Sequence, residues 1–305
     1  MSKASRKVIK RLFNPIKLNR AIRLHRNRKT VDRTTYDPQL KLYSDFLTND
    51  MLHYGYFDEI DIDPEKISIH DMEVDQIKYA KLFIDHIMDR ENPVLDVGCG
   101  MGGLAHLIET DGFHVTALTP DQAQANYIKD KYPEIPVIRV KFEEIDLSKR
   151  YGTICHAESL QYINLEKAFE IIDKILLPDG TWIICDYFRK HDDSSERSGH
   201  TFKKFENEVQ SRKWQITKME DITQHVLPTL KYVYVFGTRF LKPLSDFAIG
   251  KLKVKQPGIH YIAADFIAET HAKVLNGMET VNPDKFYAEK QYLFITIKKQ
   301  KDTNR

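Results

Sequence analysis

The sequence predicts an α/β protein whose core is a doubly wound, mostly parallel sheet. From residue 93 onward, short apolar runs alternate with stretches of helical periodicity. Each run is apolar throughout, as expected for parallel strands that helices cover on both faces. A glycine-rich turn directly follows the first run, which is where such sheets bind ligands. Strands are predicted at residues 94–97, 115–118, 137–140, 153–157, 181–187 and 292–297, and helices at 103–109, 120–131 and 165–176.

The segments around this alternating region differ from it in composition. Residues 34–90 are predicted to form a helical and aromatic cap, with a break at Gly55 and a helix over 68–90. Residues 91–300 then form a domain of enzyme size. Within that domain, residues 190–285 open with polar side chains and continue with many aromatic ones. We therefore expect a helical insertion before the last strands that covers a substrate.

The composition is that of an ordinary enzyme-sized protein. The 305 residues are 42% hydrophobic and 30% charged, which excludes collagen-like and mostly disordered chains. No apolar run approaches the roughly 18 residues that a membrane span needs, and no export signal is evident. Cys99, Cys155 and Cys185 lack the CxxC spacing of a thiolate metal site. We therefore expect a reduced, cytoplasmic protein without a bound metal.

Residues 1–33 form a strongly basic arm. They hold 12 Lys or Arg side chains and one acid, Asp32, whereas the rest of the chain holds 34 basic and 43 acidic ones. Apolar residues at helical spacing predict an amphipathic cationic helix, which suits an anionic membrane surface. Packing on its own domain and a mitochondrial presequence are the alternatives. Nucleic-acid binding is not expected, because most of the chain repels phosphate. The apolar positions are Val8, Ile9, Leu12, Phe13 and Ile16.

The most informative motif runs from Val94 to Gly103, where a predicted strand enters a glycine turn and then a helix. Glycines are needed there because a side chain would hold the backbone away from a ligand. Together with Gly103, Gly98 and Gly100 satisfy the dinucleotide pattern GxGxxG, which is a weak signal alone. This glycine turn has three interpretations. It is the cofactor site of a nicotinamide oxidoreductase, a tight turn that binds no ligand, or a site for another ligand that contains a nucleoside.

Two details favour a sulfonium compound over a dinucleotide. Asp96 precedes the turn, where its carboxylate attracts the ammonium and sulfonium groups of S-adenosylmethionine but repels a pyrophosphate. About 20 residues further on, nicotinamide sites place an acid that binds ribose. This chain has Leu118, Thr119 and Pro120 at that position.

The turn and its surroundings resemble class I S-adenosylmethionine-dependent methyltransferases, and more narrowly the cyclopropane fatty acid synthases and isoprenoid C-methyltransferases. The resemblance covers roughly residues 35–300. It implies a seven-stranded, Rossmann-like methyltransferase fold, S-adenosylmethionine as cofactor and an aromatic cap that closes over it. It rests on VLDVGCGMGG at 94–103, VTALTPDQAQAN at 115–126, KFEEID at 141–146, DITQHVLPTL at 221–230 and YDPQLKLYSDFLTNDMLHYGYF at 36–57.

The resemblance also implies a set of cofactor-binding residues. Thr119 and Gln124 stand where these families bind the ribose, and both side chains can hydrogen-bond to sugar hydroxyls. Phe142 and Glu143 match a pair that flanks adenine, although without the resemblance a core role for Phe142 and a solvated Glu143 are favoured. The predicted set is Asp96, Gly98, Cys99, Gly100, Gly102, Thr119, Gln124, Phe142, Glu143 and Ala157.

Glu158 is the first candidate for catalysis. It opens the run ESLQYI, which resembles an ESxxYV element of geranyl diphosphate C-methyltransferases in which the acid faces the substrate. Glu158 can remove a proton from a cation formed at an alkene carbon, or position an amine or hydroxyl; a carboxylate that only bonds to backbone is the alternative. Tyr54 and Tyr162 can stabilise a cation through their ring faces. His53 and His225 are further candidates, although a lone His is more often structural.

One departure from the cyclopropane synthases narrows the expected reaction. Those enzymes carry a Phe-Glu-His triplet whose acid helps to hold a bicarbonate, together with a Cys in the cap. This chain has Leu160-Gln161-Tyr162 and no Cys between residues 36 and 57. A neutral amide cannot replace the carboxylate. We therefore do not expect cyclopropanation.

The sequence thus predicts methyl transfer to an apolar or amphiphilic small-molecule acceptor, such as a lipid or isoprenoid. The aromatic cap, the aromatic insertion and the cationic arm favour this acceptor class. An N- or O-methyltransferase of a small polar molecule is the first alternative. A non-catalytic methyltransferase-like subunit and an NAD-dependent oxidoreductase are the others.

Overall fold

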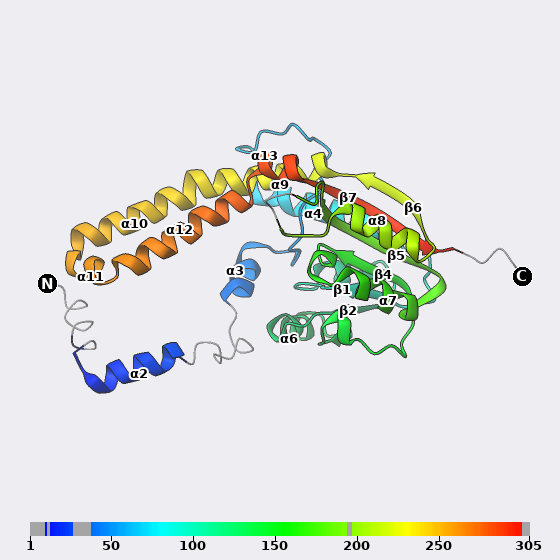
Figure 1. Ribbon diagram of the computed structural model, residues 1–305, viewed down its shortest axis with the longest axis horizontal. Helices are drawn as coiled ribbons and strands as arrows, with labels where there is room; N and C mark the ends of the chain where they lie inside the picture. The colour runs from blue at the N-terminus through cyan, green and yellow to red at the C-terminus, as the bar shows by residue number, and fades with distance from the viewer. Residues whose placement is uncertain (1–9, 11–12, 27–37, 194–196, 301–305) are drawn as a thin grey trace, which may run out of the picture. The chain divides into compact units, whose positions relative to one another are not determined.

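The computed structural model describes residues 10, 13–26, 38–193 and 197–300. It divides the chain into two compact units (Figure 1). Among the described residues, no helix is both long and apolar enough to cross a bilayer. The larger part, the sheet unit, comprises residues 34–232 and 283–305, and the smaller part, the helical unit, comprises residues 1–33 and 233–282.

The sheet unit is built on seven strands in the order β3-β2-β1-β4-β5-β7-β6. The first five strands of the chain are parallel, whereas β7 runs antiparallel between β5 and β6. This arrangement confirms the predicted doubly wound, mostly parallel sheet. The strands are β1 Val94–Val97, β2 Val115–Leu118, β3 Val137–Ile138, β4 Tyr151–Ala157, β5 Leu176–Arg189, β6 Trp214–Asp221 and β7 Lys290–Lys299.

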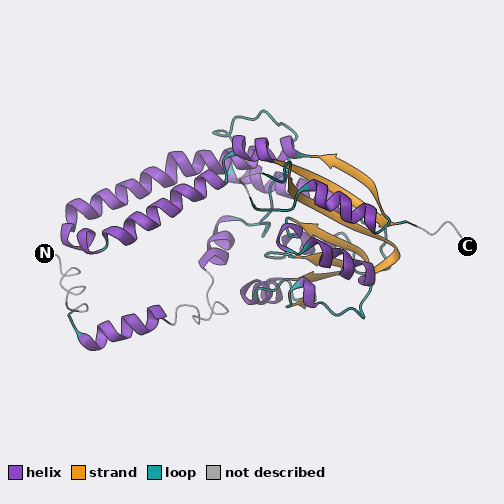
Figure 2. Ribbon diagram, in the orientation of Figure 1, coloured by secondary structure: helices purple, strands orange, loops and turns teal. Residues whose placement is uncertain are grey.

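Helices surround the sheet and alternate with the strands as far as β5 (Figure 2). Local capping explains where several begin. Asp121 accepts hydrogen bonds from the first-turn amides of α6, and Ser68 forms a capping box with Asp71 at the start of α4. The helices are α3 Pro38–Phe46, α4 Ile69–Ile84, α5 Gly103–Thr110, α6 Gln122–Lys131, α7 Leu165–Ile175, α8 Phe202–Ser211, α9 Thr223–Phe236 and α13 Pro283–Glu289, with short 3₁₀ turns at Phe142–Glu144 and Leu160–Tyr162.

The region predicted as a helical insertion contains a strand, β6, that the sequence pattern does not reveal. β6 pairs only with β7, at the edge of the sheet, and after the buried Trp214 its side chains alternate between exposed and partly buried positions. Such an edge strand needs no apolar run. The polar residues Lys218 and Glu220 interrupt the pattern, so the strand was not predicted from the sequence. The helical insertion itself lies between β6 and β7, before the last strand, as predicted.

The core of the sheet unit packs α7 and α8 onto β5. Trp182 of β5 is fully buried, and its ring meets Phe169 of α7 edge to face at 4.9 Å between centroids. Phe205 of α8 packs on both rings. Rings of this size contribute most of the apolar burial in a core. The packing fixes the sheet while leaving the carboxyl ends of its parallel strands available for a site.

The helical unit contains a hairpin of helices and a separate helix from the basic arm. The hairpin consists of α10 Lys242–Lys255, α11 Pro257–Ile262 and α12 Ala264–Thr280, and it follows a π-helical turn at Gly237–Leu241. α10 and α12 contact each other along their length (Figure 2). The arm forms α2 over Pro15–Arg26. The predicted helical positions Val8, Ile9 and Leu12 lie outside the described residues.

Candidate functional site

A cavity of about 390 Å³ lies at the carboxyl ends of β1 and β4. These strands are neighbours, yet the chain leaves β1 toward β2 and leaves β4 toward β5, on the opposite side. Such a reversal of strand order opens a crevice between the connecting loops, and ligands of α/β sheets bind there. Ten of the predicted site residues line this cavity, namely His53, Asp96, Gly98, Cys99, Gly100, Thr119, Gln124, Ala157, Glu158 and Tyr162.

The glycine turn forms one wall of the cavity and leaves no room for side chains. Gly98 has φ +72°, and a Cβ built there would lie 2.5 Å from the Cβ of Ser159. Gly100 has φ +56°, and its Cβ would lie 3.2 Å from the side chain of Leu52. Both positions therefore favour glycine for conformation, and Gly98 requires it for space as well. Gly102, with φ +89°, begins α5 and does not line the cavity.

Asp96 presents an unpaired acid to the cavity. Its side chain is almost completely buried, and its Oδ2 atom has no hydrogen-bond partner among the described residues. Burial raises the pKa of Asp96 to about 7. A buried carboxyl group without a partner is costly, so the fold gains free energy when a cation reaches it. The site is thus suited to a positively charged ligand.

Thr119 and Gln124 meet at the end of β2. The Thr119 hydroxyl donates a hydrogen bond to Gln124 Oε1 at 2.6 Å. This bond occupies the carbonyl end of the amide and leaves the Gln124 Nε2 group as the donor for a ligand. The pair lines the cavity, as expected for a contact with sugar hydroxyls.

Phe142, Glu143 and Cys99 occupy different surroundings. Phe142 is buried in the core, edge to face with His156 at 5.4 Å between centroids, and does not line the cavity. Glu143 is exposed and does not line it either. Cys99 does line it, and burial raises the pKa of its thiol, so the thiol stays protonated.

Glu158 forms the polar centre of the opposite wall, directly after β4. Its Oε1 atom accepts hydrogen bonds from the Tyr54 amide at 2.7 Å and from the Tyr292 hydroxyl at 2.8 Å. Burial raises the pKa of Glu158 to about 7, although these two bonds oppose the shift. Glu158 also has φ +54°, a left-handed conformation that is strained for a residue with a side chain. The fold therefore holds this carboxyl group at the cavity with a pKa matched to proton transfer near neutral pH.

His53 adds a neutral base to the same cavity. Its Nδ1 atom lies 2.8 Å from the Tyr54 carbonyl oxygen, which can only accept, so Nδ1 donates. Burial lowers the pKa of His53 to about 4, so the ring is neutral at physiological pH and its Nε2 atom carries a lone pair. That atom has no hydrogen-bond partner among the described residues. The ring stacks on Tyr79 at 4.1 Å between centroids, which fixes its orientation.

The remaining catalytic candidates divide between the cavity and its surroundings. Tyr162 lines the cavity and is largely exposed. Tyr54 lies beside it and bonds to Glu158 through its backbone amide, while its ring packs on Tyr292 at 5.6 Å between centroids. His225 is not part of the cavity lining, because its Nδ1 atom bonds to Phe57 and its ring stacks on Tyr56.

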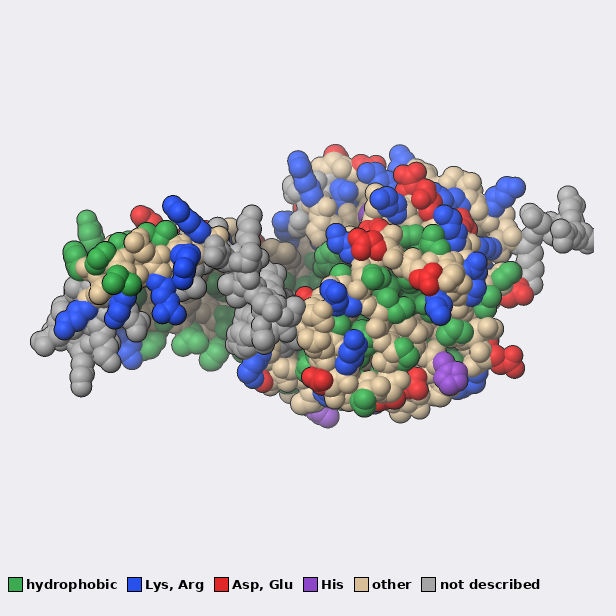
Figure 3. Space-filling view, turned by 90° about the horizontal axis from the view of Figure 1, so that it is seen from below, with side chains coloured by type: hydrophobic (Ala, Val, Ile, Leu, Met, Phe, Trp, Pro, Cys, Tyr) green, Lys and Arg blue, Asp and Glu red, His purple; other side chains and the backbone are tan. Residues whose placement is uncertain are grey.

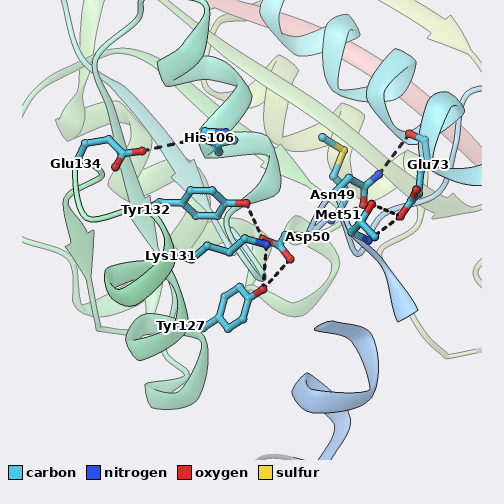
Figure 4. Close-up of polar contacts among 10 residues, drawn as sticks. Asn49, Asp50, Met51, Glu73, His106, Tyr127, Lys131, Tyr132 and Glu134 are labelled. Atoms are coloured by element: carbon cyan, nitrogen blue, oxygen red, sulfur yellow. Dashed lines mark hydrogen bonds and ion pairs between the residues drawn. The ribbon is translucent and has the colours of Figure 1, made fainter. Parts of the chain in front are cut away.

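The segment Asp50–His53 crosses the cavity and is fastened at Asp50 (Figure 4). The buried Asp50 carboxylate accepts hydrogen bonds from Tyr127 at 2.9 Å and from Tyr132 at 2.6 Å, and it pairs with Lys131 at 2.6 Å. All three partners belong to α6 or to the residue that ends it. We call this arrangement the Asp50 anchor, and it holds Leu52 and His53 over the glycine turn.

Two side chains near Glu158 were not predicted from the sequence. Asp186, on β5 beside β4, is buried, and burial raises its pKa to about 8. It accepts hydrogen bonds from the amides of Gln161 and Tyr187. Tyr292 lies near the start of the antiparallel strand β7, so its position at the carboxyl edge of the sheet follows only once the direction of β7 is known. Asp186 could have been found, because it follows the apolar run of β5 at the same edge.

Residues 94–180 match the profile of the protein family described as "Methyltransferase domain". Residues 94–180 are thus similar to known methyltransferase domains. Solved methyltransferases share its fold at low sequence identity. Geranyl diphosphate C-methyltransferase from Streptomyces coelicolor superposes with a TM-score of 0.61 at 13% identity over 87% of this chain and 99% of its own. A cyclopropane synthase from Mycobacterium tuberculosis gives 0.59 at 13% identity over 87% and 95% of the two chains.

Curated relatives are similar to this methyltransferase domain over a shorter stretch. An uncharacterized methyltransferase of Alkaliphilus oremlandii is 29% identical over 106 residues, which are 33% of this chain and 49% of that protein. An (S)-tetrahydroprotoberberine N-methyltransferase of Eschscholzia californica is 34% identical over 100 residues, which are 30% and 27%. The chain thus matches half or less of the length of these relatives. The recognition of the S-adenosylmethionine-dependent methyltransferase group from the sequence is confirmed.

Proposed function

We propose that this protein transfers a methyl group from S-adenosylmethionine to an apolar or amphiphilic acceptor, such as a lipid or isoprenoid. The unpaired, buried carboxyl group of Asp96 beside the glycine turn carries the proposal, because it demands a cationic ligand in the crevice where this fold binds nucleosides. The geranyl diphosphate C-methyltransferase of S. coelicolor was solved with S-adenosyl-L-homocysteine, which supports the same cofactor here.

The residues of the cavity fit the donor chemically. Asp96 suits its charged amino acid part, the glycine turn admits close backbone approach, and the Gln124 amide suits its ribose. When bound, the donor supplies a methyl group already activated by its positively charged sulfur. The protein then has to bind and orient the acceptor and to exclude water, since proximity and alignment provide most of the acceleration.

Glu158 is suited to manage the proton that the acceptor loses. Its carboxylate would take a proton from the acceptor atom, or from a carbon next to the one that is methylated, as the acceptor receives the methyl group from the donor. Tyr54 and Tyr292 hold Glu158 through Oε1. Neither of these two bonds uses Oε2, which is therefore the oxygen that we assign to the acceptor.

Aromatic side chains around Glu158 favour an apolar acceptor. The Phe286 ring meets the rings of Tyr54 and Tyr187 edge to face, at 6.3 Å and 5.9 Å between centroids. Tyr162 lines the cavity itself, where its ring face can stabilise a developing carbocation. The geranyl diphosphate enzyme, whose printed substrate is an isoprenoid diphosphate, shares this fold.

A small amine or hydroxyl compound is the second candidate acceptor, and His53 favours it. A neutral imidazole with a free lone pair at Nε2 can accept a hydrogen bond from an N–H or O–H group, which a hydrocarbon chain does not offer. Several relatives are ubiquinone O-methyltransferases or alkaloid N-methyltransferases. A non-catalytic subunit and a nicotinamide oxidoreductase remain the more distant alternatives.

Calorimetry and a radiolabel assay test the proposal in two steps. Titration with S-adenosylmethionine should give a binding isotherm, and titration with NADH should give none; the opposite result would make the protein an oxidoreductase. Transfer of labelled methyl groups to a lipid extract, compared with a pool of small amines and hydroxyl compounds, then identifies the acceptor class. Donor binding without transfer to either pool would point to a non-catalytic subunit.

Gly100→Val provides the matched inactive control for these assays. The new side chain must adopt φ +56° and displace Leu52, so it fills the space at the turn. We expect loss of detectable donor binding, measured by calorimetry, with the far-UV circular dichroism spectrum unchanged. Gly250→Val in α10, where a Cβ would meet nothing within 4 Å, should bind the donor normally.

The basic arm is proposed to contact a membrane surface. Within the described residues, α2 carries Lys17, Arg20, Arg23 and Arg26 and no acid, which suits anionic lipid headgroups. On the face of the sheet unit seen in Figure 3, by contrast, basic and acidic side chains are interspersed, so that face offers no basic path for a nucleic acid. Deletion of residues 1–33 should weaken flotation with anionic vesicles, and unchanged flotation would exclude membrane contact through the arm.

A further inference from the structure

The hairpin of the helical unit carries an outward-facing apolar stripe. No residue of α10 or α11 is buried, and Met278 is the one buried residue of α12. Phe240, Leu244, Phe247, Lys251 and Val254 follow one another at intervals of four, three, four and three residues, which places them along one face of a helix. The four apolar side chains of the stripe are 51 to 76% exposed. α10 therefore has an apolar face that its contact with α12 does not use.

The end of the hairpin combines further apolar side chains with unpaired positive charge. Tyr261, Ile262 and Phe266 are 65 to 84% exposed there. Residues 247–266 hold three lysines and one acid, Asp265. Among the described residues, none of these lysines forms an ion pair, and Lys251 lies over the Phe247 ring at 5.6 Å. The three lysines are Lys251, Lys253 and Lys255.

Charged side chains nearer the base of the hairpin form ion pairs, unlike the lysines at its end. Asp246 pairs with Lys242 at 3.1 Å and with His271 at 2.9 Å, and Glu269 pairs with Lys273 at 2.6 Å. The uncompensated positive charge is therefore confined to the end that also exposes the largest apolar side chains. Lysines interspersed with aromatic and aliphatic groups are the combination that binds at the interface of an anionic bilayer.

We propose that the outer face and end of the α10–α12 hairpin bind the surface of an anionic lipid bilayer. The apolar stripe, about 21 Å long at 1.5 Å per residue, lies in the interface, and the lysines reach the phosphate groups. A second copy of this chain is a poorer occupant, because a symmetric contact sets the same patch against itself and brings the unpaired lysines of both copies together. The residues of this surface belong neither to the basic arm, residues 1–33, nor to the lining of the catalytic cavity, so the surface can be tested without the enzyme's acceptor.

Tryptophan fluorescence of a Val254→Trp variant reports insertion directly. The two natural tryptophans, Trp182 and Trp214, are buried in the sheet unit, so a change on adding vesicles comes from the new side chain. We expect a blue shift with vesicles of phosphatidylglycerol, and quenching by lipids that carry a spin label in the upper acyl chain. No shift with these vesicles overturns the proposal.

Flotation with the same vesicles measures how much the face contributes in the full chain. Phe247→Glu combined with Val254→Glu should lower the fraction bound at least about tenfold, because it removes apolar contact and adds negative charge. Met88→Glu combined with Leu147→Glu, at exposed apolar positions of the sheet unit, is the matched control and should bind normally. Equal binding of both double variants and the unmodified protein would mean that the hairpin does not contact lipid.

Charge variants and the molar mass separate the bilayer from a protein partner. Replacing Lys251, Lys253 and Lys255 by Ala should weaken binding about fivefold for each lysine, whereas Arg at all three positions should preserve it. Light scattering after gel filtration should give the mass of a monomer for the unmodified protein. A dimer that the Phe247→Glu and Val254→Glu changes convert to monomers would assign the face to a second copy and overturn the bilayer proposal.

Discussion

Asp96 and Glu158 are both acids with raised pKa values, yet their surroundings suit them to different tasks. Within the part of the chain that the structure describes, Asp96 has an unpaired oxygen and no neighbouring cation, so it is arranged for the charge of a ligand. Glu158 is held by two hydrogen bonds on one oxygen, so it is arranged to exchange a proton in a fixed position. Two acids of similar pKa can thus serve donor binding and acceptor chemistry separately.

The first prediction at the residue scale concerns donor affinity and pH. Asp96 is largely protonated below pH 7 and ionised above it, so the affinity for S-adenosylmethionine should rise about tenfold between pH 6 and pH 8. Asp96→Asn should bind the donor weakly and with no such pH dependence. Calorimetry at both pH values checks this. Asp130→Asn, at an exposed position of α6, serves as the control and should retain the dependence.

The second prediction concerns turnover. Glu158→Gln keeps the oxygen that accepts from Tyr54 and Tyr292 but removes the base, so kcat should fall about 100-fold while the affinity for the donor stays nearly unchanged. For the unmodified protein, kcat should rise through pH 7, as Glu158 loses its proton. Full activity of the Gln variant would reduce Glu158 to a structural role.

Tyr292→Phe gives an independent check on the same group. The Tyr292 hydroxyl stabilises the ionised form of Glu158, so its removal should raise the pKa of Glu158 and move the rise of kcat to higher pH. A merely structural change would lower kcat equally at every pH. Measurement of kcat between pH 6 and pH 9 distinguishes the two outcomes.

At the scale of elements, the Asp50 anchor holds the segment Asp50–His53 against α6. Gly103, at the start of α5, also fits closely under this segment, because a Cβ there would lie 2.6 Å from the Asn49 carbonyl oxygen. The polar contacts of the anchor therefore fasten a segment that backbone packing already brings near (Figure 4). The placement of the segment Asp50–His53 decides whether Leu52 and His53 face the glycine turn.

A prediction for the Asp50 anchor follows from its charges. Asp50→Ala leaves the hydroxyls of Tyr127 and Tyr132 and the amine of Lys131 without their common acceptor, which should lower the free energy of unfolding by about 2 to 4 kcal/mol. The donor should also bind more weakly, since residues 50–53 line the cavity. Urea unfolding and calorimetry measure the two effects.

The control for the anchor is Asp45→Ala. Asp45 pairs with Lys41 at the surface of α3, where both side chains are mostly exposed, and such pairs contribute little. We expect no change in donor affinity and a small change in stability. If Asp50→Ala behaved in the same way, the segment would be held by backbone packing alone.

Local patterns were enough to predict the central elements, but not those that depend on distant partners. β1 and β2 have the predicted bounds, because each is an apolar run that ends at a turn. β6 was missed because an edge strand with alternating polar side chains depends on its pairing with β7. The glycine turn and Glu158 were found from motifs, whereas Tyr292 and Asp50 reach the site from sequence distances that no local pattern spans.

At the scale of the whole molecule, the buried titratable groups predict an unusual dependence of stability on pH. Burial raises the pKa values of Asp96, Glu158 and Asp186 to about 7, 7 and 8, above their unfolded values, so the folded state holds more protons there than the unfolded state. Stability from such acids is lost as pH rises. Burial instead lowers the pKa values of His53 and His156 to about 4 and 3. The stability of the folded state therefore increases with pH through these histidines, but only up to their pKa in the unfolded chain, which is about 6.5.

The two effects oppose each other below pH 6.5, and above it the carboxyl groups act alone. We therefore expect the melting temperature to fall between pH 6.5 and pH 8. Each of these acids should lower the free energy of unfolding by about 1.4 kcal/mol per pH unit until the pH reaches its pKa in the folded state. Saturating S-adenosylmethionine should flatten this slope, because the cation lets Asp96 ionise in the folded state. Differential scanning fluorimetry in buffers of equal ionic strength measures both slopes, and a melting temperature that rises from pH 6.5 to pH 8 would show that these acids are ionised and solvated in the folded protein.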